Sequence, residues 1–200
     1  MIKFGTDGWR AGIADQYTFA NVRTIAQAVA DFLHLHGQAE QGMIVGYDTR
    51  FRSDEFAAAA AEVLAGNGIR ALLCDAPTPT PVSSYAIVHH HTAGGINITA
   101  SHNPYTDNGF KLRSEYGGAA APEVLQEVEA LIARVKEPRR LPLADAVRDG
   151  LVQHVDPAPP YIEHLGSLVD LARLRNAGLH VALDPMWGVG VGWIPRLIGG

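Results

Sequence analysis

Residues 95–104 read GINITASHNP, and residues 107–111 read DNGFK. The first five residues, rich in β-branched side chains, predict a buried strand that ends near Thr99. Pro104 prevents an ordinary continuation as strand or helix, so the chain is expected to turn just after Ser101. In open α/β sheets, ligands bind outside the carboxyl ends of the strands. A hydroxyl there, with His102 beside it and Lys111 ten residues further on, suits nucleophilic or phosphoryl-transfer chemistry.

The same stretch also has a purely structural interpretation. Ser101 and Asn103 could lie in a polar turn and hydrogen-bond only to neighbouring backbone groups. A motif this short does not separate the two interpretations by itself. The rest of the chain has to decide between them.

The composition indicates a folded chain with one domain, or one domain and part of another. Of its 200 residues, 47% are hydrophobic and 18% are charged, with a net charge of −5. The basic residues are scattered, so we expect neither a nucleic-acid partner nor a membrane surface as partner. No apolar run approaches the roughly 20 residues of a membrane span. A lone cysteine, Cys74, and an N-terminus without a signal sequence predict a cytoplasmic protein.

Strand-like and helix-like segments alternate along the first two thirds of the chain. This order predicts a three-layer α/β/α domain with a mixed, mainly parallel sheet. Asn108 and Gly109 are typical of a turn, which would bring Lys111 back toward the Ser101 loop. Strands are expected at residues 43–47, 69–74, 95–99 and 110–112. Helices are expected to begin after the caps Thr18 and Ser53, near Thr80, and at Pro122.

The remaining third predicts a second, incomplete unit. Residues 138–150 show no period and are interpreted as a connection, and the proline-rich residues 156–160 as a linker. A unit as small as the one that follows cannot bury its own faces. We therefore expect a domain over residues 1–155 and the truncated start of a second α/β domain over 156–200. Its expected elements are a helix at 161–170, a strand at 179–183 and a helix at 193–198.

Two other segments carry candidate anion-binding residues. Residues 4–12 (FGTDGWRAG) contain glycines that let backbone amides approach an anion, and Arg10 could hold a phosphate through two hydrogen bonds. The alternative is a simple turn between a strand and a helix. Arg50 follows the strand at 43–47, at the same sheet edge as Ser101 if the strands are parallel. It could face the site, or it could brace the loop by pairing with Asp48.

The three consecutive histidines His89, His90 and His91 do not predict a metal site. Neighbouring side chains on a helix point about 100° apart and cannot converge on one ion.

Four segments together resemble the α-D-phosphohexomutase superfamily, in particular its phosphoglucomutase/phosphomannomutase branch. In chain order they are residues 4–10 (FGTDGWR), 47–50 (YDTR), 99–111 (TASHNPYTDNGFK) and 116–118 (YGG). The serine segment is the most specific of the four, and YDTR is supportive only.

The resemblance implies an isomerase of carbohydrate metabolism, an intramolecular phosphotransferase. Ser101 would be the phosphoserine, which gives its phosphoryl group to a hexose monophosphate and recovers the other phosphate of the resulting bisphosphate. Lys111 matches a lysine that transfers protons, and Arg10 matches an arginine near the transferred phosphate. His102 and Asn103 would shape the serine loop, and phosphoryl transfer does depend on cations placed around the phosphate.

The resemblance also implies a phosphosugar substrate, a Mg²⁺ ion, and hexose 1,6-bisphosphate as intermediate and activator. Asn103 and Arg50 are expected to bind phosphate or substrate. In the family an Asp-x-Asp-x-Asp loop holds the Mg²⁺, and this sequence has no such loop. Ser101 would therefore contribute to a metal site only through its phosphate. We expect the chain to be domain I with the start of domain II, to depend on the missing parts of domains II–IV, and to be inactive alone.

Three alternatives remain open at this point. The first is a phosphoglucosamine mutase, and the second is a non-catalytic phosphate-binding or interaction module. The third is a serine hydrolase that uses Ser101 and His102. This sequence lacks the G-x-S-x-G turn typical of a serine hydrolase. A histidine directly after the serine is also expected to project away from it at a strand end.

Overall fold

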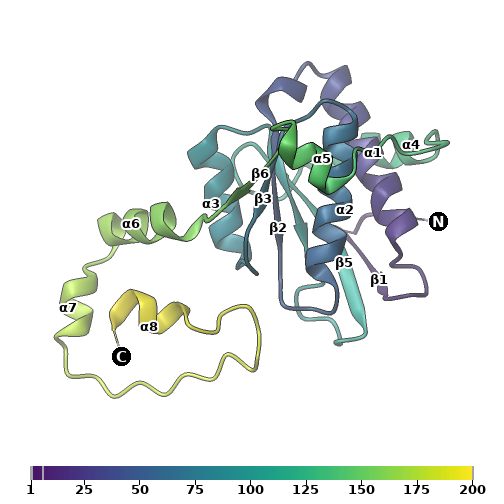
Figure 1. Cartoon of the computed structure of the whole chain (residues 1–200). Helices are drawn as coiled ribbons and strands as arrows, with labels where there is room; N and C mark the ends of the chain where they lie inside the picture. Colours follow the sequence, from purple (N-terminus) through teal and green to yellow (C-terminus); the bar gives the residue numbers. More distant parts are fainter. Residues whose placement is uncertain (1, 6, 200) are drawn as a thin grey trace.

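The computed structural model describes residues 2–5 and 7–199, so Thr6 of the FGTDGWR segment lies outside the described residues. Six strands form one sheet in the order β1-β5-β4-β2-β3-β6 (Figure 1). β2, β3, β4 and β6 run parallel, whereas β5 is antiparallel to both β4 and β1. The predicted mixed, mainly parallel sheet is confirmed. The strands are β1 (Trp9–Gly12), β2 (Met43–Tyr47), β3 (Ala71–Cys74), β4 (Gly94–Ile98), β5 (Asp107–Ser114) and β6 (Val152–Val155).

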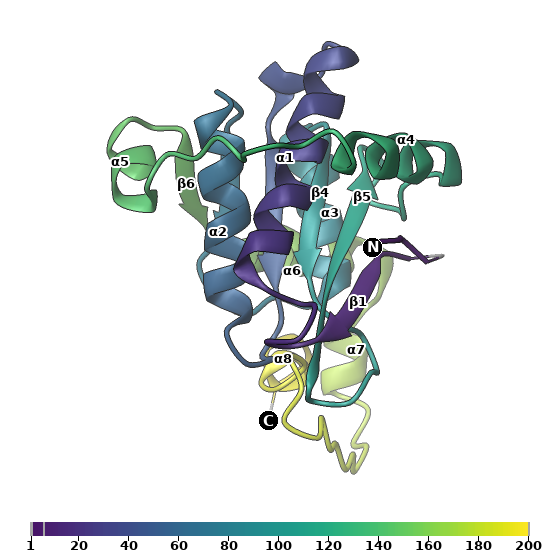
Figure 2. The ribbon, with the colours of Figure 1, turned by 90° about the vertical axis from the view of Figure 1, so that its right-hand side faces the viewer.

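Helices cover both faces of this sheet. Figures 1 and 2 show α1 and α2 on one face and α3 on the other, which gives the three predicted layers. α4 packs against α1, and α5 packs against α2. Among the described residues, none of the helices is long and apolar enough to cross a membrane. The helices are α1 (Phe19–Leu35), the 3-10 turn η1 (Ala39–Gln41), α2 (Ser53–Gly66), α3 (Thr80–His90), α4 (Pro122–Ile132), α5 (Leu143–Arg148), α6 (Ala158–Leu168), α7 (Leu171–Arg175) and α8 (Trp193–Ile198).

The central strands are apolar on both faces because helices cover both. Successive strand residues point to opposite faces, so each strand feeds two cores. Val45 and Ile96 belong to the larger core under α1 and α2. Ile44 and Leu72 belong to the smaller core under α3. This explains why the sequence shows continuous apolar runs here rather than an alternation of apolar and polar residues.

One predicted helix cap is confirmed and one is wrong. The Thr18 hydroxyl accepts a hydrogen bond from the Asn21 amide at the start of α1. At α2 the cap position is Arg52, in the left-handed region with φ 58°. Ser53 is instead the first helical residue, and its hydroxyl donates to Asp48 Oδ1 at 2.9 Å. The sequence predicts that the Ser53 hydroxyl caps the helix. In the structure this hydroxyl donates to Asp48 instead.

Two predictions about the middle of the chain are wrong. Residues 138–150 are not only a connection, because they contain α5, and β6 then follows and pairs with β3. β6 shows no apolar pattern in the sequence because it is an edge strand in which only Val152 is buried. Asn108 and Gly109 form no turn but lie inside β5. The chain reverses earlier, over residues 99–106, and Lys111 still returns alongside β4, opposite Asn97.

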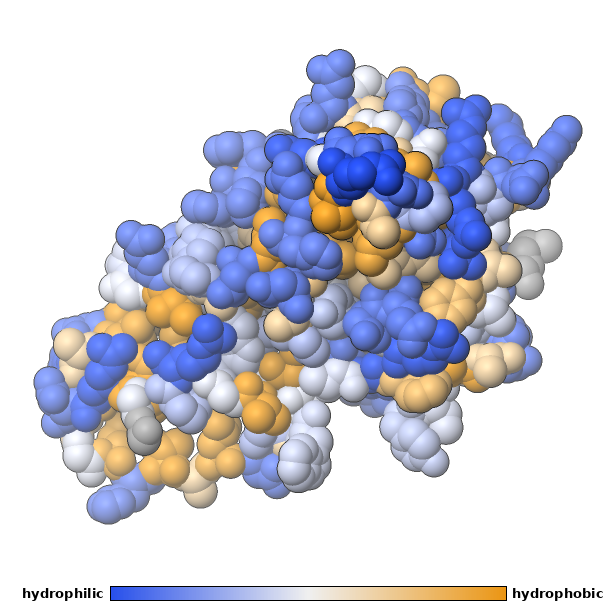
Figure 3. All heavy atoms as spheres, in the orientation of Figure 1, coloured by the Kyte–Doolittle hydropathy of each residue, from blue (hydrophilic) through white to orange (hydrophobic). Residues whose placement is uncertain are grey.

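The C-terminal part forms helices and extended chain outside the sheet (Figure 1). α6 begins at Ala158, inside the proline-rich residues 156–160, because proline is tolerated in the first turn of a helix. The strand predicted at 179–183 is not formed. A strand needs a neighbour to pair with, and no sheet of the described residues reaches this segment. Apolar side chains such as Leu179 and Val181 are consequently exposed. Figure 3 shows hydrophobic residues at the surface of the C-terminal part.

The close approach of β1, β4 and β5 at Gly109 gives a stability prediction. A Cβ at Gly109 would lie 2.4 Å from the Thr99 carbonyl oxygen and 3.0 Å from that of Trp9. We expect Gly109→Ala to lower the free energy of unfolding by about 1–3 kcal/mol, as overpacking does, in urea denaturation. The matched control is Gly118→Ala, whose Cβ would lie 3.8 Å from Ser114 Oγ and should cost little. Equal effects of the two substitutions would contradict this packing.

Candidate active site

The carboxyl ends of β2 and β4 and the start of β5 meet at one edge of the sheet. This is where a mainly parallel sheet is expected to bind a ligand. A cleft of about 700 Å³ opens at this edge. Its walls come from the ends of β2 and β4, the loops after β3 and β4, and a segment between α7 and α8. The lining residues are 47–51, Thr78, Thr80, 97–99, 101–103, Tyr105 and 186–189.

Ser101 lies exposed on the wall of this cleft in an uncommon backbone conformation. Its φ is 57°, in the left-handed region, which costs a residue with a side chain about 1–2 kcal/mol. Two hydrogen bonds fix the residue. Its amide donates to Thr99 Oγ1 at 3.0 Å, and its carbonyl oxygen accepts from Arg50 Nη2 at 2.9 Å. Both backbone groups of Ser101 are therefore held by side chains, while the residue itself stays open to the cleft.

His102 lies closer to the serine than the sequence predicted. Its Nδ1 is 3.4 Å from Ser101 Oγ. The expectation that His102 projects away is wrong, because the left-handed turn at Ser101 changes the direction of the chain. A hydrolase triad would also need a group that orients the histidine. Among the described residues, none other than Ser101 forms a side-chain hydrogen bond with His102.

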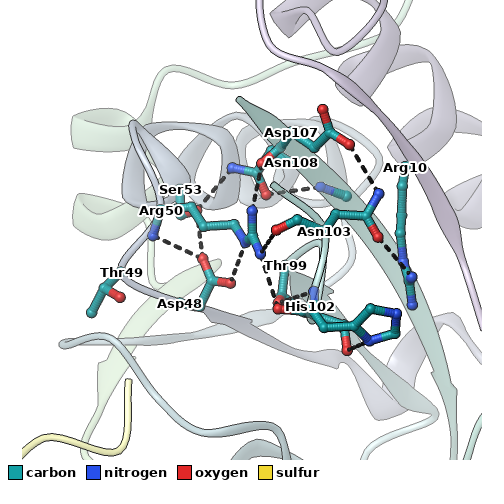
Figure 4. Close-up of polar contacts among 12 residues, drawn as sticks. Arg10, Asp48, Thr49, Arg50, Ser53, Thr99, His102, Asn103, Asp107 and Asn108 are labelled. Carbon is teal, nitrogen blue, oxygen red and sulfur yellow. Dashed lines mark hydrogen bonds and ion pairs between the residues drawn. The ribbon is translucent and has the colours of Figure 1, made fainter. Parts of the chain in front are cut away.

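Arg10 and Asn103 are brought to the serine loop together. Arg10 Nη1 donates to Asn103 Oδ1 at 3.0 Å, and Asn103 Nδ2 donates to Asp107 Oδ2 at 2.9 Å (Figure 4). β1 delivers Arg10, which lies opposite Gly109 of β5. The N-terminal segment thus reaches the loop that carries Ser101.

Arg50 holds the serine loop in place through contacts within the protein, without a phosphate. A guanidinium group has five N–H donors, and the four on Nη1 and Nη2 are all donated to main-chain carbonyls, while Nε is ion-paired with Asp48. The bracing interpretation is supported. Phosphate binding by Arg50 stays a prediction, which this arrangement does not favour because the four Nη–H groups are already donated. Nε pairs with Asp48 Oδ2 at 3.3 Å, Nη1 donates to the carbonyls of Pro104 and Asp107 at 2.8 and 3.0 Å, and Nη2 donates to those of Ser101 and Asn103 at 2.9 and 2.8 Å.

Lys111 is placed apart from the other predicted residues. Its Nζ donates to Asp7 Oδ2 at 2.6 Å, and its side chain is only 6% exposed. Arg113 Nη1 lies 3.4 Å from the other oxygen of Asp7. Lys111 is not among the residues that line the cleft. The structure therefore places His102 and Asn103 on the cleft wall with Ser101 and holds Arg10 against Asn103, although Arg10 does not line the cleft either. Lys111 stays in an ion pair with Asp7.

A series of hydrogen-bonded polar side chains that the sequence does not predict supports the cleft. Asn108 is fully buried, and its Nδ2 donates to Ser53 Oγ at 2.9 Å. Ser53 Oγ in turn donates to Asp48 Oδ1, which also accepts the Arg50 amide at 3.0 Å. The sequence gives little indication of these hydrogen bonds, because Ser53 resembles a helix cap and Asn108 resembles a turn residue.

The described residues do not by themselves make a metal site. Among them, no three His, Cys, Asp or Glu side chains lie close enough together to hold a metal ion. His89, His90 and His91 are no exception. A phosphate on Ser101 would add oxygen ligands of the kind that Mg²⁺ prefers.

Burial changes the titration of two groups near the same edge. The pKa of Tyr47, on the cleft wall, is raised, mainly because the ring is partly buried and then because Asp54 lies nearby. The pKa of the Cys74 thiol is raised from its ordinary 9.0 to about 11, because burial disfavours the thiolate. Cys74 is therefore no candidate nucleophile at neutral pH.

The thiol of Cys74 gives a pH-dependence prediction. In the unfolded chain the thiol loses its proton near pH 9, whereas the folded chain keeps it to about pH 11. The unfolded state binds fewer protons in this window, so the free energy of unfolding falls as the pH rises, by up to about 1.4 kcal/mol per pH unit. The contribution is fully present below pH 9.

The measurement compares urea denaturation of the wild type and Cys74→Ala from pH 8 to pH 11. Because Tyr17 and Tyr47 also have raised pKa values, both proteins lose stability at high pH. The wild type should lose more than the variant between pH 9 and pH 11. Parallel curves would show that the thiol is not buried as described.

Comparison with known proteins identifies the family. Residues 1–139 match the family described as "Phosphoglucomutase/phosphomannomutase, alpha/beta/alpha domain I". The chain belongs to this family. A phosphoglucomutase of Komagataeibacter xylinus is 30% identical over 97% of the chain and 38% of its own length. A probable phosphomannomutase of Haemophilus influenzae is 38% identical over 79% of the chain and 30% of its own length.

Solved structures of family members share the fold. A putative phosphomannomutase from Thermus thermophilus superposes with a TM-score of 0.86 at 37% identity, over 99% of this chain and 44% of that one. The phosphoglucomutase parafusin from Paramecium gives a TM-score of 0.84 at 20% identity, which supports the fold alone. The chain thus spans less than half the length of the relatives it matches.

Proposed function

We propose that this chain supplies the phosphoserine of a phosphohexose mutase, with Ser101 as the phosphoryl carrier. The observation that carries the proposal is the exposed Ser101, fixed in a left-handed turn on the wall of the cleft. The similarity to phosphoglucomutases and phosphomannomutases supports the reaction class. The substrate would be a hexose 1- or 6-phosphate.

The proposed step exchanges one phosphate ester for another. A sugar hydroxyl oxygen forms a bond to phosphorus, the bond from phosphorus to Ser101 Oγ breaks, and the proton of the sugar hydroxyl ends on Oγ. Arg10, which uses one nitrogen on Asn103, has further N–H groups that can meet the phosphoryl oxygens. His102 Nδ1 is 3.4 Å from Oγ, so it can exchange a proton there.

Lys111 remains the proton-transfer candidate by family resemblance, but its position limits that role. Its ammonium group is hydrogen-bonded to Asp7 Oδ2. In this arrangement the lysine would have to leave Asp7 before it could reach a sugar hydroxyl. We therefore assign Lys111 a proton-transfer role only in a form of the site where that ion pair is opened.

The proposal includes the domain division and the metal. Residues 1–155 would form the phosphoserine domain, and residues 156–200 would begin a second domain of a longer mutase. The relatives' greater length and the unpaired segment at 179–183 support this division. Mg²⁺ would neutralise charge on the phosphoryl oxygens, with Ser101 as a ligand through its phosphate only.

Phosphate transfer to Ser101 tests the proposal directly. The full-length protein is incubated with glucose 1,6-bisphosphate and Mg²⁺, and its peptides are analysed by mass spectrometry. We expect one phosphate on Ser101, none in Ser101→Ala, and an unchanged result in the control Ser167→Ala, which alters an exposed serine of α6. Phosphate that spreads over other serines, or persists in Ser101→Ala, would show that the carrier is misassigned.

The 200-residue chain and the full-length protein are expected to differ in mutase turnover. We expect the 200-residue chain alone not to interconvert glucose 1-phosphate and glucose 6-phosphate, because the metal ligands are missing. In the full-length protein, Ser101→Ala should reduce mutase activity to background without unfolding the domain. Turnover by the chain alone, or an active Ser101→Ala, would contradict the proposal.

A second substrate class has specific support. A phosphoglucosamine mutase of Roseobacter denitrificans is 30% identical over 96% of the chain and 44% of its own length. A comparison of glucose, mannose and glucosamine 1-phosphates in the full-length protein would decide which sugar is preferred. We propose a neutral hexose, and a preference for glucosamine 1-phosphate would favour the alternative.

A further inference from the structure

Four main-chain carbonyl groups accept hydrogen bonds from one side chain, that of Arg50: those of Ser101, Asn103 and Pro104 in the loop after β4, and that of Asp107 at the start of β5. Figure 4 shows the Arg50 side chain directed at this loop. These carbonyls belong to residues spread from Ser101 to Asp107, so one rigid guanidinium group ties together the whole turn. The side chain of Arg50 is only 14% exposed. An arginine that served a phosphate would keep Nη–H groups directed at the cleft, whereas all four of these are donated to carbonyls and Nε is ion-paired with Asp48.

We infer that Arg50 is a positioning residue, which holds Ser101 in the left-handed conformation required for phosphoryl transfer and does not bind the phosphate. The inference rests on the proposed function of Ser101 for its catalytic part. Its structural part concerns the loop conformation and stands on the hydrogen bonds alone.

The conformation of Ser101 needs such a device. A residue with a side chain stays at positive φ only where its surroundings fix it there. Thr99 Oγ1 holds the amide of Ser101, but that bond is local and comes from the strand end itself. Arg50 holds the carbonyl group from a different element of the fold. With Arg50 removed, the carbonyls of Ser101 and Asn103 lose the donor that they share.

Arg50 is itself held at both ends. Asp48 pairs with its Nε through Oδ2 and accepts its amide through Oδ1. Asp48 is fixed by Ser53, and Ser53 by the fully buried Asn108 of β5. The carboxylate also offsets the charge of the guanidinium group, which leaves Arg50 little net attraction for a phosphate. The arrangement therefore suits positioning better than ligand binding.

Lysine at position 50 distinguishes the two roles. It keeps the positive charge but offers three donors from a single nitrogen, and it cannot reproduce a planar fork that reaches four carbonyls. If Arg50 attracted phosphate by its charge, Arg50→Lys would retain much of the function. If Arg50 positions the loop, Arg50→Lys should behave like Arg50→Ala.

The experiment uses the 200-residue chain for NMR and the full-length protein for phosphate transfer and calorimetry, each with Arg50→Lys, Arg50→Ala and the control Arg52→Gln. Arg52 is a suitable control because it is two residues away, pairs with Glu55 and stacks over Phe19 instead of contacting the loop carbonyls. Backbone NMR reports the conformation of Ser101 and the hydrogen exchange of the Asn103 and Asp107 amides. Peptide mass spectrometry over time reports the rate of phosphate transfer from glucose 1,6-bisphosphate.

We expect both Arg50 variants to lose the left-handed chemical shifts of Ser101 and to exchange the loop amides at least about tenfold faster. The transfer rate should fall about 100-fold, the effect of misplacing a reacting atom by about 1 Å. The affinity for glucose 1,6-bisphosphate, measured by calorimetry, should change less than about threefold, because the phosphate loses no direct contact. Guanidinium ion added to Arg50→Ala should restore part of the rate, methylammonium should not, and Arg52→Gln should match the wild type.

Several results would overturn the inference. A wild-type Ser101 conformation in both variants would show that Arg50 does not position the loop. Retained transfer in Arg50→Lys, or a loss of affinity equal to the loss of rate, would show that Arg50 acts on the phosphate. Unfolding of both variants would contradict a role confined to the loop. If the wild type takes up no phosphate, the proposed function fails, while the NMR comparison still decides the structural part.

Discussion

The position of β4 in the middle of the sheet is the constraint on which the rest of the site depends. β4 is paired with β2 in parallel on one side and with β5 in antiparallel orientation on the other. Ile96 and Ile98 are fully buried in the larger core, whereas on the other face of the strand a Cβ at Gly95 would lie 2.7 Å from Ile87 Cδ1. A slip by one residue would turn the isoleucines to that crowded face. The burial of two isoleucines therefore fixes where Ser101 leaves the sheet and enters the cleft.

Beyond the strand end, the loop depends on side chains that come from other elements. The segment after β2 delivers Asp48 and Arg50, and β1 delivers Arg10. The core decides which edge of the sheet carries the serine, and these polar contacts decide how its backbone is turned. The division is physically reasonable, because apolar burial has no direction whereas hydrogen bonds to carbonyls do.

The sequence predicted what depends on periodicity and on specific motifs. Apolar runs indicated β2 and β4, the Thr18 cap indicated the start of α1, and the TASHNP segment indicated the candidate serine. Prediction failed where tertiary contacts override local preference. Asn108 and Gly109 look like a turn, but a buried hydrogen bond to Ser53 and the close approach of Thr99 place them inside β5. β6 has too few buried residues to show a pattern, and the segment at 179–183 lacks a partner strand.

The central claim, that Ser101 carries a phosphoryl group, is tested most directly on the protein isolated from its native source. Intact-mass and peptide mass spectrometry should find one phosphate, located on Ser101, in at least part of the molecules. Incubation with excess hexose monophosphate should then remove it. A protein that is never phosphorylated on Ser101, or a phosphate there that no sugar phosphate can remove, would contradict the account.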